Sequence, residues 1–210
     1  FGWTNCAELI FSTPFPDEWP RSGSGAIITW RSDTDCQRGE TAVAGYFYMT
    51  CYSGFDYISV TPRPVDQLAK VSDCLAHETT LQMGDLGWVT FSPGAASVGC
   101  NPCKAMCIPD GNQVDPPSLA LHVTPGGGTA TCAAGAVACD QVVTKGGSSP
   151  LGDLGYYVYL LGLRGDSSPM KKIECGISYG GNVPTGQVDQ TGIDGKPIMH
   201  FDPKKPQWSE

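Results

Sequence analysis

Ten cysteines are the residues of this chain with the most direct chemistry. They are Cys6, Cys36, Cys51, Cys74, Cys100, Cys103, Cys107, Cys132, Cys139 and Cys175. So many thiols are rare in the reducing cytosol, whereas disulfides form and persist in oxidising compartments. The even count predicts five disulfides and a secreted or cell-surface protein. Because four cysteines precede residue 99 and six follow it, each half is expected to close its own disulfides, in a pairing that the sequence leaves open.

Some of these cysteines are also spaced closely enough to begin a zinc site. The ligands of such a site would come from Cys100, Cys103, Cys107, Cys132, Cys139 and His122. Structural zinc usually takes two pairs of closely spaced ligands, and Cys132 and Cys139 are too far apart for such a pair. Disulfides therefore remain the favoured interpretation, and no metal site is predicted here.

A serine motif raises the alternative of a secreted hydrolase. Gly176-Ile-Ser178-Tyr-Gly180 matches the G-x-S-x-G pattern, and Asp189, Asp194 and His200 follow in the order of a hydrolase triad. The segment after the motif is too short to supply the remaining strands and helices of such a fold. We therefore interpret the motif as the end of a strand and keep a secreted hydrolase, using Ser178 or paired carboxylates, as a second alternative.

Small groups of carboxylates offer two further chemistries. Asp33, Asp35 and Glu40 form one group, and Asp189 and Asp194 form another. Paired carboxylates can hydrolyse glycosides, and loop carboxylates can hold calcium. Neither group has the spacing of an EF-hand, so solvated loop acids are the favoured interpretation. No cofactor is expected, with calcium as the alternative.

Tyrosines form the most distinctive surface pattern. In the segment 42–52, Tyr46, Tyr48 and Tyr52 alternate with Phe47, Met49 and Cys51, so the two sets occupy opposite faces of a strand. Tyr157 and Tyr159 repeat the alternation on a second strand. If the first set faces solvent, it forms a platform for sugar stacking or a contact for a partner subunit. The alternative is a strand buried on both faces.

The elements that must position these residues are mainly short strands. Alternating or β-branched apolar segments predict strands at 25–30, 42–52, 56–61, 87–91, 118–124, 136–144, 155–163 and 170–179. One segment differs, because Val65, Leu68, Val71 and Leu75 recur at helical spacing behind Pro64. The predicted fold is therefore all-β, with disulfide-rich β-sandwich-like modules and one short helix at about 64–78.

Cysteine distribution and composition predict three parts. Residues 1–99 form an N-terminal β module with four cysteines and the helix, and residues 100–182 form a C-terminal disulfide-rich β-sandwich module. Residues 183–210 are polar and rich in Gly and Pro, and they predict an extended arm carrying Trp208.

Charge and hydropathy exclude several function classes. A net charge of −8 disfavours nucleic acid and anionic membrane surfaces. No apolar run is long enough to span a bilayer. The chain starts at Phe1 without a leader-like segment, so we expect a mature export product.

Together these features favour a non-enzymatic extracellular protein. We expect a structural, self-assembling subunit of a fibre or filament, an appendage or a coat, held by disulfides and by strand or arm contacts between subunits. The expected interface residues are Tyr46, Tyr48, Tyr52 and Trp208. The alternative is a secreted β-sandwich module that binds a carbohydrate or a protein, using the same tyrosines.

Overall fold

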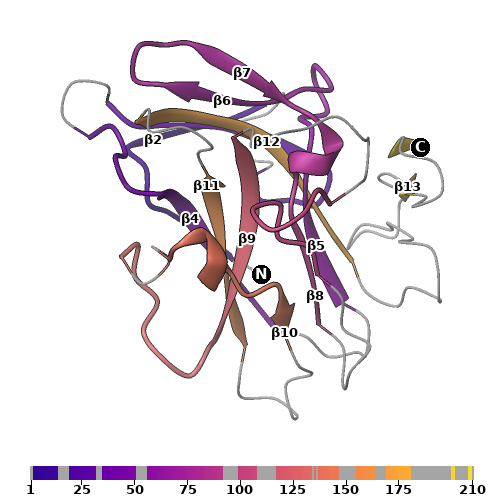
Figure 1. The fold of residues 1–210 in the computed structure, drawn as a ribbon. Helices are drawn as coiled ribbons and strands as arrows, with labels where there is room; N and C mark the ends of the chain where they lie inside the picture. Colours follow the sequence, from indigo (N-terminus) through magenta and orange to yellow (C-terminus); the bar gives the residue numbers. More distant parts are fainter. Residues whose placement is uncertain are drawn as a thin grey trace.

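The computed structural model describes residues 2–13, 19–31, 35–50, 56–91, 99–107, 117–133, 135, 137–146, 155–163 and 169–180, with the backbone of 200–201 and 208–209. These residues form two main β-sheets and two single-turn 3₁₀ helices, Met83–Asp85 and Cys139–Gln141 (Figure 1). The predicted all-β, disulfide-rich class is therefore confirmed. A short separate pair, β13 (His200–Phe201) and β14 (Trp208–Ser209), lies near the C-terminus.

The smaller sheet has four antiparallel strands in the order β1-β4-β11-β9. Their bounds are Gly2–Asn5 for β1, Thr41–Met49 for β4, Tyr156–Leu163 for β11 and Ser118–Pro125 for β9. Tyr48 lies opposite Gly2 on one side and Tyr157 on the other. This register places tyrosines of β4 and β11 side by side.

The larger sheet has eight strands, and β12 (Met170–Gly180) lies at its centre. The other strands are β2 (Leu9–Thr13), β3 (Ser24–Thr29), β5 (Asp56–Thr61), β6 (Ala69–Asp73), β7 (Glu78–Leu81), β8 (Trp88–Phe91) and β10 (Lys145–Gly146). One edge of β12 pairs with β3, and the other edge pairs with β6 and then β5. Strand β2 pairs with β3 and is the last strand on that side within the described part of the chain.

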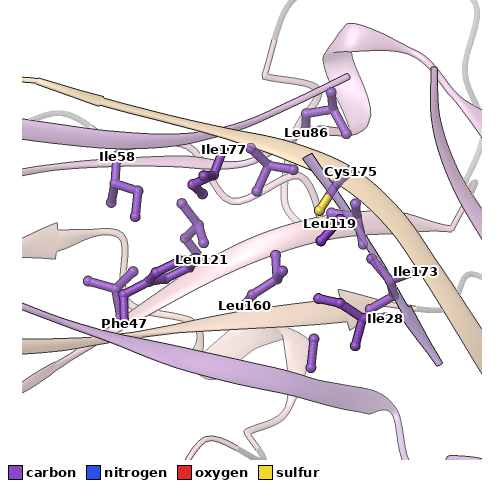
Figure 2. Close-up of a cluster of buried hydrophobic side chains, with 14 of the residues drawn as sticks. Ile28, Phe47, Ile58, Leu86, Leu119, Leu121, Leu160, Ile173, Cys175 and Ile177 are labelled. Carbon is purple, nitrogen blue, oxygen red and sulfur yellow. The ribbon is translucent and has the colours of Figure 1, made fainter. Parts of the chain in front are cut away.

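The core lies between the two sheets. Phe47, Leu121 and Leu160 come from the smaller sheet and pack against residues of the larger sheet that include Ile28 and Ile177 (Figure 2). Alternation with period two explains this, because every second side chain of a strand faces the partner sheet. Phe47 and Met49 are buried in this core, on the face that the sequence predicts for them.

The expected division into two modules at residue 99 is corrected by the strand pairing. In the smaller sheet β4 pairs with β11, and in the larger sheet β3 and β5 pair with β12. Each sheet therefore combines strands from both sides of residue 99. The cysteine count suggested separate halves, but the Cys6–Cys132 disulfide also crosses this boundary.

The predicted helix at 64–78 is wrong, because this segment contributes to a β-hairpin of β6 and β7. Ala69 and Val71 are buried at period two, whereas Val65 and Leu75 are exposed. The helical spacing of the apolar residues therefore did not reflect burial. The predicted strand at 136–144 is also replaced, since its described residues include a 3₁₀ turn that precedes β10.

Eight of the ten cysteines form four disulfides, which fits an oxidising environment. The pairs are Cys6–Cys132, Cys36–Cys74, Cys100–Cys107 and Cys103–Cys139. The expectation of five disulfides is corrected at Cys175, which is a free thiol on the core side of β12. Burial raises the pKa of this thiol to about 12, so it stays protonated and unreactive at neutral pH. Cys51 lies outside the described residues.

Candidate functional site on the sheet surfaces and the β2 edge

The tyrosine face lies on the outer side of the smaller sheet. The ring centroids of Tyr46 and Tyr157 are 5.7 Å apart, and those of Tyr48 and Tyr157 are 5.3 Å apart. Tyr159 packs 5.3 Å from Tyr46. These are the separations of edge-to-face and tilted aromatic pairs, so the rings form one contiguous cluster, which the pairing of β4 with β11 brings together.

Half of this cluster is covered by the chain that follows β9. Ala130, Val137 and Val142 join Tyr159 and Leu161 in a second apolar cluster outside the smaller sheet. The Tyr46 hydroxyl donates a hydrogen bond to the Ala130 carbonyl at 3.4 Å. Tyr159 is consequently buried, whereas Tyr48 keeps 41% of its surface exposed. The outer face is thus neither an open ladder nor a fully buried strand.

His122 belongs to the same covered region. Its side chain is buried, and its Nδ1 accepts a hydrogen bond of 3.0 Å from the backbone N–H of Val143. Since Nδ1 is the acceptor, the neutral ring carries its proton on Nε2. Burial lowers the pKa of His122 below its ordinary value of 6.5, so this histidine stays neutral and fixes the covering segment to β9.

Tyr48 is the part of the tyrosine face that a ligand can reach. Gly2 of β1 lies opposite Tyr48, and no other heavy atom lies within 4 Å of the position that a Cβ would occupy at Gly2. On its other side the ring packs against the backbone of Gly155 and the ring of Tyr157. This arrangement is a small, shallow aromatic platform. Of the other predicted interface residues, Tyr52 lies outside the described residues, and Trp208 is described only by its backbone pairing with Phe201.

Ser178 is not placed as a nucleophile elbow requires. It lies inside β12, pairs with Ser59 of β5 and is 1% exposed. A nucleophile elbow needs a turn from a strand into a helix, whereas β12 continues as a strand to Gly180.

The predicted carboxylate groups divide between described and undescribed parts of the chain. Glu40 lies at the surface, where its Oε1 accepts a hydrogen bond of 2.8 Å from the Cys139 N–H. Asp33, Asp189 and Asp194 lie outside the described residues. Within the described ranges, no group of three or more His, Cys, Asp or Glu side chains is arranged to hold a metal ion.

A feature that the sequence analysis missed is the β2 edge, the strand Leu9–Thr13. Its partner among the described strands is β3, in a register that sets Phe11 opposite Ile27. Leu9 and Phe11 are each 52% exposed, and Ile10 between them packs against the core. The signal was present as three consecutive apolar residues, Leu9, Ile10 and Phe11, but a run this short does not reveal a strand by its pattern.

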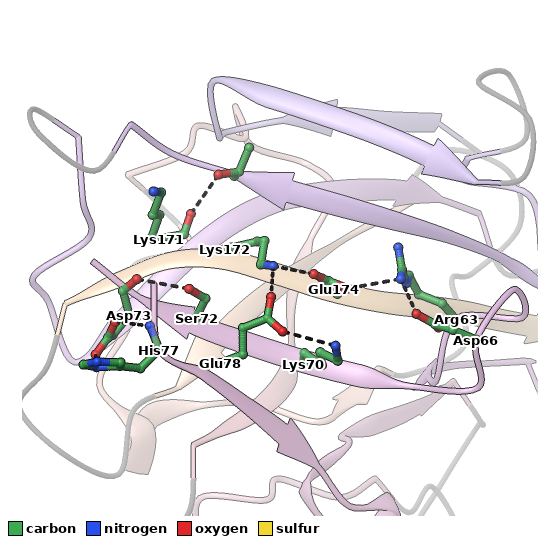
Figure 3. Close-up of polar contacts among 11 residues, drawn as sticks. Arg63, Asp66, Lys70, Ser72, Asp73, His77, Glu78, Lys171, Lys172 and Glu174 are labelled. Atoms are coloured by element: carbon green, nitrogen blue, oxygen red, sulfur yellow. Dashed lines mark hydrogen bonds and ion pairs between the residues drawn. The ribbon is translucent and has the colours of Figure 1, made fainter. Parts of the chain in front are cut away.

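The outer face of the larger sheet carries a chain of ion pairs (Figure 3). Glu174 of β12 contacts Arg63 at 3.1 Å and also pairs with Lys172. Lys172 and Lys70 both pair with Glu78, and hydrogen bonds from these lysines lower the pKa of Glu78. Arg63 additionally pairs with its neighbour Asp66. The alternation of charged and apolar residues along β12 could have indicated this outward face.

Comparison with known proteins gave no match to any protein family, curated protein or solved structure. In the described part of the chain, no helix has the length and apolar character needed to cross a bilayer.

Proposed function

We propose that this chain is a non-enzymatic extracellular structural protein, a subunit of a fibre, appendage or coat. The observation that carries the proposal is the β2 edge. Leu9 and Phe11 stand half-exposed on β2, the last of the described strands on one side of the eight-stranded sheet.

Edge strands of monomeric proteins are usually protected against association. Lysine, proline, a bulge or a covering loop blocks the row of backbone N–H and C=O groups that another strand could otherwise pair with. The sequence Leu-Ile-Phe-Ser-Thr of β2 contains neither a charge nor a proline, and its register with β3 is regular. These properties suit a strand that pairs with another chain.

The disulfides suit an assembly that must persist outside the cell. They link the β1 end of the smaller sheet to the segment after β9, and the connection after β3 to the β6–β7 turn. Such links restrict the unfolded chain and thereby stabilise a protein that is exposed to proteases and dilution. Secretion and a cell-surface location are part of this proposal.

In the same proposal, residues 183–210 act as an arm that docks on a neighbouring subunit by strand addition. Two short strands in this segment, β13 and β14, already pair with each other. Trp208 would then be an interface residue.

Native mass measurement tests the proposal. Mass photometry and negative-stain imaging of the protein, with and without Gly195–Glu210, are expected to show oligomers or filaments that weaken on truncation. A monodisperse species near the chain mass of 22.2 kDa in both samples would contradict the assembly function.

The exposed Tyr48 ring favours a second candidate function, the binding of a glycan. Sugar rings stack on exposed aromatic faces, and Tyr48 is 41% exposed beside the open position at Gly2. A glycan array would test this with wild type, Tyr48→Ala and the control Val65→Ala. The candidate is supported only if a glycan binds wild type and the control but not Tyr48→Ala.

A further inference from the structure

We propose that β2 pairs antiparallel with β2 of a second copy across a twofold axis. The two eight-stranded sheets would then form one continuous sheet through the dimer. This inference deepens the proposed assembly function and rests on it.

The apolar side chains at the β2 edge form a short outward strip. Leu9 and Phe11 point away from the core, and each is 52% exposed. Ile27 of β3 lies directly opposite Phe11 and is half-buried. A strand that added to β2 would lay its own outward side chains beside this strip.

The strip is complementary to itself. If Ile10 lies opposite Ile10 of the second copy, antiparallel pairing sets Leu9 opposite the second Phe11, and the reverse, on the outer face. Both exposed apolar side chains then gain an apolar cross-strand partner, and such pairs stabilise sheets. With Phe11 opposite Phe11 instead, Leu9 would face Thr13. The first register therefore buries more apolar surface.

Charge would normally keep copies of this chain apart, because its net charge is −8. On the outer face of the larger sheet, however, the charges are internally neutralised. Three positive side chains, Arg63, Lys70 and Lys172, pair with three negative ones, Asp66, Glu78 and Glu174. Beside β2 itself, Glu8 pairs with Arg31 at 3.3 Å and is also hydrogen-bonded to Asp35. A second copy that approaches along this face meets mainly paired charges, with one carboxylate in excess at the Glu8–Asp35 contact, and a strand without any charge.

These properties favour a second copy over a foreign strand. A twofold contact uses the same patch on both chains, so the patch must complement itself in shape and charge. The outward Leu9 and Phe11, on a strand without charges and beside mainly paired charges, satisfy that condition.

Variants that introduce charged residues into β2 test the pairing of β2 with β2. The double variants Leu9→Lys/Phe11→Lys and Leu9→Glu/Phe11→Glu each create two like-charged cross-strand pairs in a homodimer. The matched control is Val65→Lys/Leu75→Lys, at residues outside β2 that are 55% and 77% exposed. All substituted residues are substantially exposed, so the variants are expected to fold, which circular dichroism would verify. Sedimentation equilibrium would give the dimer Kd of each protein.

We expect each β2 variant to raise the dimer Kd by roughly tenfold or more, and the control to leave it near the wild-type value. An equimolar mixture of the lysine and glutamate variants is expected to restore dimers, because opposite charges then face each other. Native mass spectrometry would identify these as heterodimers.

Three results would overturn the inference. If wild type assembles and the β2 variants assemble equally well, the β2 pairing is wrong while the assembly function stands. If both variants are monomeric and their mixture also stays monomeric, the edge does not pair with itself, and a foreign strand becomes its partner. If wild type is monomeric, both the inference and the assembly function fail.

Discussion

Arg63 and Glu174 show how individual residues hold the outer face of the larger sheet. Their side chains are only 10% and 7% exposed, so the pair is largely removed from water. Burying an ion pair costs desolvation energy, and removing one partner leaves the other charge buried and poorly compensated. Lys172 still compensates part of the Glu174 charge.

Arg63→Ala is therefore expected to lower the free energy of unfolding by about 3 kcal/mol. The matched control is Arg31→Ala, because Arg31 is 73% exposed in its pair with Glu8, and its loss should cost less than about 1 kcal/mol. Urea unfolding of the three proteins measures both values. Equal losses in the two variants would show that burial of the Arg63 pair is energetically irrelevant.

His122 makes stability dependent on pH. Burial lowers its pKa in the folded state, while the unfolded chain keeps the ordinary value of 6.5. Below pH 6.5 the unfolded state consequently binds more protons than the folded state, so stability falls as pH decreases through this range. Protonation of Nδ1 would also remove the acceptor for the Val143 N–H.

We expect the urea midpoint of wild type to fall between about pH 7.5 and about pH 5.5, the range where histidine titrates. His122→Asn should show a smaller fall, because asparagine offers a hydrogen-bond acceptor close to the backbone and does not titrate. Identical pH dependence in both proteins would assign the effect to other groups.

Among the elements, the β6–β7 hairpin shows why local spacing misled the helix prediction. Leu75 follows β6 and is 77% exposed, although the helical pattern treats it as an inward residue. Gln67, before β6, and Ala76, after it, adopt positive φ values of 58° and 66°. Positive φ is incompatible with a right-handed helix of L-residues, so a helix cannot run through either position. The segment between them forms a strand because it pairs with β12, a long-range contact that the local sequence pattern does not reveal.

The longer strands were predictable because each one is a long apolar segment rich in aromatic residues. Thr41–Met49 and Tyr156–Leu163 belong to this class, whereas their pairing, which joins their tyrosines into one cluster, was not predicted. The β2 edge was not predictable, since a five-residue run does not reveal which strand ends a sheet. The place of β2 at the side of the sheet depends on long-range strand pairing. The burial of Tyr159 likewise depends on long-range contacts with the segment that follows β9.

The Cys6–Cys132 disulfide fastens this cover to the start of the smaller sheet. It closes a sequence separation of 126 residues, whereas Cys100–Cys107 closes only 7. A longer closed loop restricts the unfolded chain more strongly. Cys6→Ala/Cys132→Ala is therefore expected to cost roughly 4–5 kcal/mol, against roughly 2 kcal/mol for Cys100→Ala/Cys107→Ala.

Urea unfolding of both double variants under non-reducing conditions checks this order. A larger loss for the short-loop variant would show that native contacts around that disulfide, rather than loop closure, control the effect.

At the scale of the whole molecule, neither sheet can form from one half of the chain. Residues 1–99 lack β11, which lies between β4 and β9, and β12, which lies between β3 and β5. A fragment of residues 1–99 is thus expected to show no cooperative thermal unfolding and a circular dichroism spectrum typical of a disordered chain. Cooperative unfolding of this fragment would instead restore the division into two modules.

The central position of β12 also affects when the larger sheet can form during synthesis of the chain. Strand β3 ends at Thr29 and can pair early with β2, yet its second partner, β12, begins only at Met170. At a synthesis rate of about 5–20 residues per second, β3 waits on the order of 10 s for that partner. Folds dominated by such distant pairings also fold slowly once complete. During this interval β3 and β5 are apolar strands without their shared neighbour, so the nascent chain is most prone to aggregation before β12 has emerged.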